Sequence, residues 1–334
     1  IRPYSHKLCR VKYLPKENKV TGKITWHYVK IKKHKVSRYL SVISEYRKAF
    51  KKQELKNTVV LTDTINPLCV QAATYIGKTH KIPVVGICTD SPSNITSASR
   101  SYTLFLLNRS RKCNGYITLT EELNDLYNEE NKPHLVIEGI VENEEDIKEV
   151  NVKKPYLFFC GSLLERYGVY NLINAFNNLN RDDIDLIIAG HSGNMEQFNK
   201  AILSNNNIHY LGTINVKDVL NYEAHAIANI NPRPYSEDLD RYSIPSKTIE
   251  YLTSGVPTIS VRNSKLQPYF QDEAIWINSS SSDALEGAMN DVIKMSNEEK
   301  VLLGNRAKEK VKECFSLDQI NQKVSQFLTN FSNN

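Results

Sequence analysis

Residues 156–179 read YLFFCGSLLERYGVYNLINAFNNL, and this stretch decides the fold. Its first five residues form a short apolar run that is typical of a buried strand. Gly161 then permits a turn, and from residue 168 to residue 179 the apolar residues recur every three or four positions, which predicts a helix. A buried strand followed directly by an amphipathic helix is the repeating unit of a parallel α/β sheet.

The same alternation extends along the chain in both directions. Strands are predicted at 58–62, 83–88, 115–119, 134–138, 156–160, 184–189, 208–211, 228–231, 257–261 and 274–277. Helices are predicted at 66–79, 98–112, 168–179, 194–204, 215–226, 245–254 and 283–294. The fold class expected from this order is therefore α/β with parallel sheets.

The alternation is interrupted once, and the interruption divides the chain. Acidic residues between 142 and 149 lead into Lys153-Lys154-Pro155, which is typical of a linker. We expect a Rossmann-like domain over 1–149, a second over 155–315, and a cleft between them. A final helix within 316–334 carries one apolar face and is expected to pack back toward the N-terminal domain.

Composition excludes several classes of protein. The 334 residues are 40% hydrophobic, which suits two globular cores, and no apolar run is long enough to span a membrane. No signal-peptide pattern follows Ile1, so a cytoplasmic location is expected. The six cysteines are spaced singly, which predicts reduced packing residues and neither a zinc site nor a disulfide framework.

The charge is concentrated at the N-terminus. Residues 1–56 contain 17 Lys and Arg against three Glu, although the net charge of the whole chain is only +6. Lys30, Lys32, Lys33 and Lys35 cluster there near Trp26. This region either binds an anionic membrane surface or forms a solvated helix and loop. Nucleic acid is not expected as a partner, because no recognition motif accompanies the charge.

In open α/β sheets, ligands bind beyond the carboxyl ends of the strands. After the strand at 156–160, Gly161 and Ser162 allow close backbone approach, and Arg166 could reach a phosphate near the start of the next helix. The alternative is that Gly161 only forms a turn.

The connection after the strand at 228–231 is the second candidate site. Its 13 residues supply Arg233 and Arg241, and connections of this length in compact domains are usually functional. A helix follows at 245–254, where Lys247 and Glu250 share one face at the positive end. They could hold a diphosphate and a sugar hydroxyl, or form only a surface ion pair.

Four segments together resemble a known family. They are Gly161-x-Leu163 with Tyr167-Gly168, Tyr210-Leu-Gly-Thr213, Pro245-Ser-Lys-Thr-Ile-Glu-Tyr251 and Ser254-Gly-Val-Pro-Thr258. This pattern resembles the donor domain of retaining, nucleotide-sugar-dependent glycosyltransferases of the GT-B fold, in the family 4-like group that builds bacterial surface glycans. The resemblance implies two Rossmann-like domains, a UDP- or GDP-sugar as substrate, no prosthetic group and no metal.

The resemblance also implies roles for individual residues. Glu250 would bind the ribose hydroxyls, and Ser246 at the start of its helix would face the diphosphate. Gly161 and Ser162 would lie beneath the diphosphate, and Thr213 would sit beside the nucleobase.

Three positions depart from the family pattern. Tyr242 stands eight positions before Glu250 where many members carry a glutamate, and Ser162 and Tyr167 replace an arginine and a lysine. The departing diphosphate still needs positive charge. The available substitutes are Arg166, Arg233, Arg241 and Lys247. We expect Arg241 and Lys247 to be the catalytic pair among them. The usual opening strand and glycine-rich loop are not recognisable, which is consistent with a chain truncated at its start.

The acceptor side is expected in the N-terminal half. Asp90, just after the strand at 83–88, could orient the acceptor hydroxyl or could cap a following helix. The expected reaction moves a sugar to a hydroxyl of a lipid-linked glycan at the inner face of the cell membrane. A non-catalytic binding subunit and a nucleotide-sugar epimerase on the same fold are the alternatives, whereas a dehydrogenase is disfavoured because no Gly-x-Gly-x-x-Gly opens a helix.

Overall fold

The computed structural model describes residues 2–3, 19–21, 24–26, 28–29, 35–50, 57–94, 99–141, 146–191 and 194–332. The chain forms two compact units. Unit 1 comprises Ile1–Ile137 and Lys323–Asn334, and unit 2 comprises Glu138–Gln322. Lys30, Lys32 and Lys33 of the basic cluster lie outside the described residues, so the membrane-surface expectation stays a prediction.

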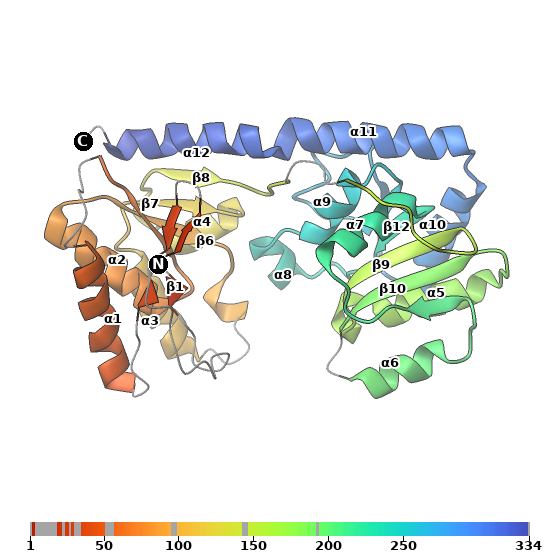
Figure 1. Cartoon of the computed structure of the whole chain (residues 1–334), viewed down its shortest axis with the longest axis horizontal. Coiled ribbons are helices and arrows are strands. Elements are labelled where there is room, and N and C mark those ends of the chain that lie inside the picture. The colour runs from red at the N-terminus through yellow and green to blue at the C-terminus, as the bar shows by residue number, and fades with distance from the viewer. Residues whose placement is uncertain are drawn as a thin grey trace. The chain divides into compact units, whose positions relative to one another are not determined.

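Unit 1 is built on a four-stranded parallel sheet with the order β5-β6-β7-β8. Figure 1 labels β6, β7 and β8 of this sheet. Its strands are β5 (Val60–Asp63), β6 (Val84–Cys88), β7 (Gly115–Thr118) and β8 (His134–Val136). Its helices are α1 (Lys35–Phe50), α2 (Pro67–His80), α3 (Arg100–Ser110) and α4 (Glu121–Tyr127), with a 3-10 turn at Pro92–Asn94. All four strands predicted in this half of the chain are present.

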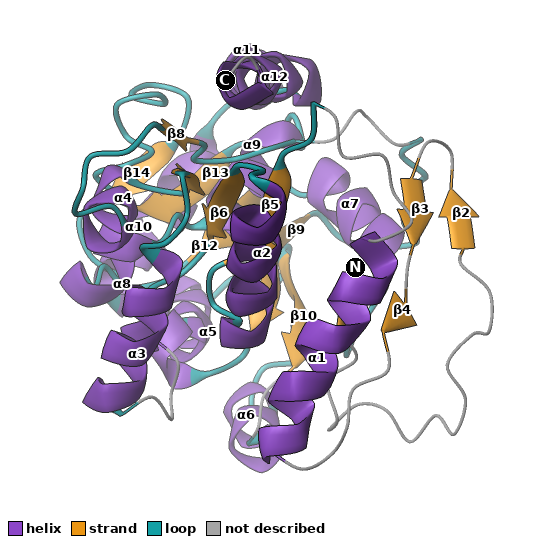
Figure 2. Ribbon diagram, turned by 90° about the vertical axis from the view of Figure 1, so that its left-hand side faces the viewer, coloured by secondary structure: helices purple, strands orange, loops and turns teal. Residues whose placement is uncertain are grey.

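Two local features explain α2 and its partner. Asn66 caps α2 by accepting hydrogen bonds from two backbone amides, and Pro67 occupies the first position, where its missing N–H costs nothing. α1 packs along α2 through a buried apolar cluster, so the two helices lie side by side (Figure 2). α1 was not predicted, because the basic residues within Lys35–Phe50 conceal its short apolar face.

Four short strands precede α1. They are β1 (Arg2–Pro3), β2 (Lys19–Thr21), β3 (Ile24–Trp26) and β4 (Tyr28–Val29), which pair as β1-β4 and β2-β3. At the other end of the chain, the last turns of α12 (Leu317–Ser332) belong to unit 1. A Cβ atom on Gly115 would lie 2.5 Å from the Phe331 ring, so this helix packs directly on β7 as its apolar face predicted.

Unit 2 holds a six-stranded parallel sheet with the order β11-β10-β9-β12-β13-β14. The strands are β9 (Tyr156–Ser162), β10 (Asp185–His191), β11 (Ile208–Tyr210), β12 (Ala228–Asn231), β13 (Thr258–Val261) and β14 (Ile275–Ile277). The helices are α5 (Val169–Leu179), α6 (Met195–Ile202), α7 (Val216–His225), α8 (Glu237–Tyr242), α9 (Ser246–Thr253), α10 (Ser282–Lys294) and α11 (Asn297–Phe315). A 3-10 turn at Glu165–Tyr167 precedes α5.

Alternate side chains of β9 enter different cores. Leu157 and Phe159 belong to the larger cluster formed with α5 and α10, whereas Tyr156 and Phe158 pack on the opposite face with Val219 of α7. Because both faces of the strand are buried, its sequence reads as a continuous apolar run. This double burial is why the sequence of residues 156–160 predicts a buried strand.

α11 lies against the end of α9 with no space between their backbones. A Cβ atom on Gly304 would lie 1.9 Å from the carbonyl oxygen of Gly255, which itself has a φ of +81°. Ser296 and Glu299 form a capping box that begins α11. Neither α11 nor the short helices α4 and α8 was predicted, because charged residues dominate the former and the latter span too few turns to show periodicity.

The composition led to one expectation about the cysteines and one about membrane-spanning segments. Among the described residues, Cys69, Cys88, Cys113, Cys160 and Cys314 are free cysteines. None of the helices in the described part of the chain combines the length and the apolar character that crossing a bilayer requires.

Candidate functional site

The carboxyl ends of β9 and β10 form a tightly packed glycine edge. Gly161 pairs with Gly190, and a Cβ atom on Gly190 would lie 1.8 Å from the Gly161 carbonyl oxygen. Gly168, with a φ of +80°, approaches Pro232 beyond β12 almost as closely. Backbone contact therefore requires glycine at positions 168 and 190, and the loops after β9, β10 and β12 are held together at one edge of the sheet.

Lys247 and Glu250 lie on the first turns of α9 at this edge. Lys247 Nζ donates to Glu250 Oε1 at 2.6 Å, and about a third of each side chain is exposed. No side chain caps the start of α9, whose first residue is the exposed Ser246. The sequence placed Pro245 inside the helix, but it is the N-cap residue.

Glu223 of α7 lies behind this pair. Its side chain is completely buried, Oε1 lies 3.9 Å from Lys247 Nζ, and neither carboxyl oxygen has a hydrogen-bond partner among the described residues. Burial and then the charge of Glu250 raise the pKa of Glu223 to about 9. Burial alone would lower the pKa of Lys247, but Glu250 outweighs it and the pKa is raised. Lys247 is therefore charged and Glu223 neutral at pH 7.

Tyr251 anchors α9 to the end of β9. Its hydroxyl accepts from the Cys160 amide at 2.8 Å and donates to the Cys160 carbonyl at 3.0 Å. The tyrosine ring is fully buried, and Lys247 Nζ lies 5.9 Å from the ring centroid. These bonds fix the position of Lys247 relative to Gly161, the residue that follows Cys160.

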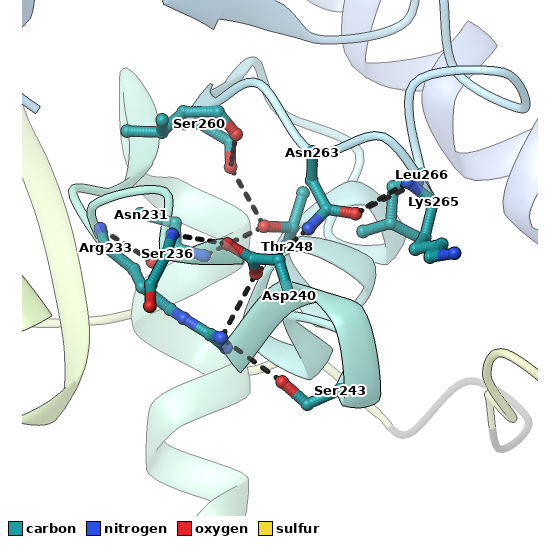
Figure 3. A network of polar contacts seen from close by, with 11 residues as sticks. Asn231, Arg233, Ser236, Asp240, Ser243, Thr248, Ser260, Asn263, Lys265 and Leu266 are labelled. Carbon is teal, nitrogen blue, oxygen red and sulfur yellow. Dashed lines mark hydrogen bonds and ion pairs between the residues drawn. The ribbon is translucent and has the colours of Figure 1, made fainter. Parts of the chain in front are cut away.

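A second set of bonds ties α9 to the neighbouring strands. Asn231 at the end of β12 donates to Thr248 Oγ1 at 2.8 Å, and this hydroxyl lies 3.0 Å from Ser260 Oγ of β13 (Figure 3). All three side chains are buried. The start of α9 is thus pre-organised at the carboxyl edge by buried hydrogen bonds.

Arg233 belongs to a buried network that holds the connection between β12 and α9. Its Nη2 lies 3.2 Å from Asp240 Oδ1 and 3.2 Å from Ser243 Oγ. The Ser236 amide and the Asn263 side chain also donate to Asp240 (Figure 3). The connection was expected to be one long loop, but it contains α8. Asp240 of that helix forms an ion pair with the Arg233 guanidinium.

The remaining cationic residues lie on the surface. Arg241 is exposed with its guanidinium 5.3 Å from the Tyr242 ring centroid, and Arg166 is exposed 5.0 Å from the Tyr167 centroid. Tyr242 and Tyr167 are two of the three positions that depart from the family pattern. In both places an exposed arginine lies over the substituting tyrosine ring.

The other expected donor residues are also at the carboxyl edge. Ser162, the last residue of β9, is exposed, and Thr213 is exposed after β11. The preceding Gly212 has a φ of +73° and its carbonyl accepts from the Gly190 amide at 2.8 Å. The loop that carries Thr213 is thereby bonded to the end of β10.

Asp90 lies in unit 1, two residues after β6. Its Oδ1 accepts from the Ser91 amide at 2.7 Å, and its backbone carbonyl accepts from the buried Tyr127 hydroxyl at 3.1 Å. Asp90 thus shapes the turn before the Pro92–Asn94 helix, and its side chain is partly exposed.

Sequence reasoning missed Glu223. A signal was present, because Glu223 follows the apolar Val219 by four residues and therefore lies on the inward face of its helix.

The described residues contain no cluster of three or more His, Cys, Asp or Glu that could hold a metal ion.

Comparisons with known structures establish the fold. A sucrose-phosphate synthase from Thermosynechococcus elongatus aligns with a TM-score of 0.72 and 12% identity, over 93% of this chain and 84% of that one. Anabaena HepE, solved with UDP and glucose, gives 0.67 and 12% identity over 91% and 86%. TarM from S. aureus, solved with UDP among other ligands, gives 0.62 and 12% identity over 87% and 59%. The GT-B-like fold of two parallel sheets with flanking helices is confirmed.

The family is established independently of these structures. No curated protein matches this chain. The family model described as "Glycosyl transferases group 1" matches residues 140–310, which are just over half of the chain and include the whole β9–α9 edge described above. The chain therefore belongs to glycosyl transferases group 1, the retaining, nucleotide-sugar-dependent glycosyltransferases of the GT-B fold.

Proposed function

We propose that this enzyme transfers a sugar from a UDP- or GDP-sugar to a hydroxyl of a lipid-linked glycan. The observation that carries the proposal is the Lys247–Glu250 pair, which α9 presents beside the glycine edge of β9. A cation and a carboxylate one turn apart match a diphosphate and the ribose attached to it. The UDP present in the HepE and TarM structures supports a uridine nucleotide as the first donor to test.

Each donor residue has a proposed task. Lys247 and Arg241 neutralise the charge that develops on the departing diphosphate, with Ser246 at the start of α9 and Arg166 beside it. Gly161 and Ser162 lie beneath the diphosphate. Glu250 accepts hydrogen bonds from the ribose hydroxyls, and Thr213 contacts the base.

Arg233 is proposed for a different task. Its pairing with the buried Asp240 makes it a support for the 232–245 connection, because pulling the guanidinium away would leave a carboxylate buried and unpaired. Asp90 in unit 1 is proposed to orient the acceptor hydroxyl. The acceptor is proposed to be lipid-linked because the basic segment 1–56 suits an anionic membrane surface. For the same reason, we propose that the enzyme acts at the cytoplasmic face of the membrane.

Calorimetry with UDP and with GDP tests the donor. We expect one nucleotide to bind at micromolar concentration and to be released from its sugar conjugate when a polyprenyl-diphosphate glycan is supplied. A folded protein that binds neither nucleotide would contradict the proposal. Binding without sugar transfer to any such acceptor would instead favour the non-catalytic binding subunit.

A further inference from the structure

The buried carboxyl group of Glu223 is unusual among the acidic side chains of unit 2. It is completely buried, on the face of α7 that packs against the sheet, and neither oxygen has a hydrogen-bond partner among the described residues. A buried polar group without a partner costs free energy, and an ionised carboxylate costs far more. A buried carboxyl group without a partner lowers the stability of the folded state. We therefore looked for a functional role for Glu223 in addition to packing.

The groups that face Glu223 come from two elements. Lys247, Glu250 and Tyr251 face it from α9, and Cys160 faces it from β9. Burial raises the pKa of both Cys160 and Tyr251, so these two groups are uncharged in the neutral range. The charges that act on Glu223 are therefore those of the Lys247–Glu250 pair.

We propose that Glu223 is a positioning residue of the donor site, which holds a proton behind Lys247 and thereby keeps the lysine ammonium available to the donor diphosphate. This inference rests on the proposed function, because it assumes that Lys247 binds the diphosphate. Glu223 itself touches no donor atom and acts only through Lys247, from the side of the ammonium that lies toward α7.

The protonation state of Glu223 decides how strongly the protein holds Lys247. With Glu223 neutral, the ammonium has one anionic partner, Glu250, and keeps donors for a ligand. With Glu223 ionised, two carboxylates surround the ammonium and the cluster carries a net negative charge next to the diphosphate. The pKa of about 9 keeps Glu223 neutral at physiological pH, and ionisation above it weakens binding of the donor.

The test is the pH dependence of UDP affinity in the intact chain. Calorimetric dissociation constants are measured between pH 7.5 and pH 10 for the wild type and for Glu223→Gln, each normalised to its own value at pH 7.5. Linkage to one proton with a pKa of about 9 predicts that the wild-type affinity falls roughly tenfold more by pH 10 than that of Glu223→Gln. Ionisation of the uracil ring affects both proteins equally and cancels in the comparison.

Two further variants secure the interpretation. Asp185→Asn removes another buried acid of unit 2, which lies at the first residue of β10 and is paired with Lys154 and His209. The UDP affinity of this variant should keep the pH profile of the wild type. Glu223→Met also lacks a titratable group, and it carries the same expectation if Glu223→Gln does not fold, as judged by thermal melting.

The outcomes separate this inference from the proposed function. If the wild type binds UDP at pH 7.5 but its normalised profile coincides with that of Glu223→Gln, the positioning role is overturned and the donor site stands. If the folded wild type binds neither UDP nor GDP at any pH, the proposed function itself is refuted.

Discussion

The guanidinium of Arg233 lies 3.2 Å from the buried carboxylate of Asp240, which stands seven residues later on α8. This pair joins the end of β12 to the helix that interrupts the 232–245 connection. Asp240 also accepts hydrogen bonds from the Ser236 amide and from the Asn263 side chain, so three groups hold its carboxylate in place. Arg233 therefore helps to fix the shape of the donor edge. Because its charge is paired with Asp240, it contributes less to the positive charge that a donor would meet there.

Replacing Arg233 should destabilise the protein. In Arg233→Ala the Asp240 carboxylate stays buried without its cation, and removing one partner of a buried pair costs about 3–5 kcal/mol. Because the Arg233 side chain is 17% exposed, we expect about 3 kcal/mol, measured as a lower midpoint of urea unfolding.

Arg241→Ala is the matched control for this arginine. Its side chain is exposed on α8, so the free energy of unfolding should change by less than about 0.5 kcal/mol while sugar transfer slows. Equal unfolding midpoints for the two variants would show that the Arg233–Asp240 pair does not support the connection.

Removing the Glu250 carboxylate should weaken nucleotide binding. If this group accepts hydrogen bonds from buried ribose hydroxyls, Glu250→Ala should lose about 1–3 kcal/mol of UDP binding, which calorimetry measures directly. Glu298→Ala removes an exposed glutamate of α11 and should leave the affinity unchanged. Wild-type affinity in Glu250→Ala would mean that the ribose is held elsewhere.

The contact between α11 and α9 should be intolerant of a single methyl group. In Gly304→Ala the new Cβ atom would overlap the Gly255 carbonyl oxygen, and the resulting shift of α11 should cost about 1–3 kcal/mol of stability in chemical unfolding. A Cβ atom on Gly287 of α10 would meet nothing within 4 Å beyond its chain neighbours and its own helix backbone, so Gly287→Ala should gain about 0.5–1 kcal/mol from helix propensity. A loss of stability in Gly304→Ala together with a gain in Gly287→Ala would distinguish the effect of the backbone contact from the effect of helix propensity.

The stability of the protein should also report the proton on Glu223. Its pKa is about 9 in the folded protein and near 4.5 when unfolded, so the folded state binds one more proton than the unfolded state between these values. The contribution of Glu223 to stability is full below about pH 4.5 and is lost progressively as the pH rises toward 9. Glu223→Gln has no such dependence.

Thermal melting at pH 5, 7 and 9 measures this difference. Relative to the wild type, Glu223→Gln should become more stable as the pH increases over that range, because the amide needs no proton to remain buried. A constant difference between the two proteins would indicate that Glu223 has an ordinary pKa, and would also count against its role behind Lys247.

Much of the candidate site was recognisable before the structure. The loops after β9 and β12 were chosen because parallel strands place their carboxyl ends at one edge, and Gly161, Lys247 and Glu250 lie there. Arg233 is predicted from its charge and from its place in the long connection after β12. Its buried partner, Asp240, lies on a helix of six residues that is too short to show an apolar period, so the pairing could not be anticipated.

Local patterns in the chain are sufficient for the strands of the two parallel sheets and for most of the helices between them, because each of these elements depends on residues within one or two turns of one another. Burial and charge pairing depend on residues that are distant in the chain. Glu223 and Lys247 are on different helices, and only their packing against β9 removes water from the carboxyl group and raises its pKa. The fold therefore decided which cations remain exposed at the donor edge, which one is held by a buried acid, and which acid keeps its proton.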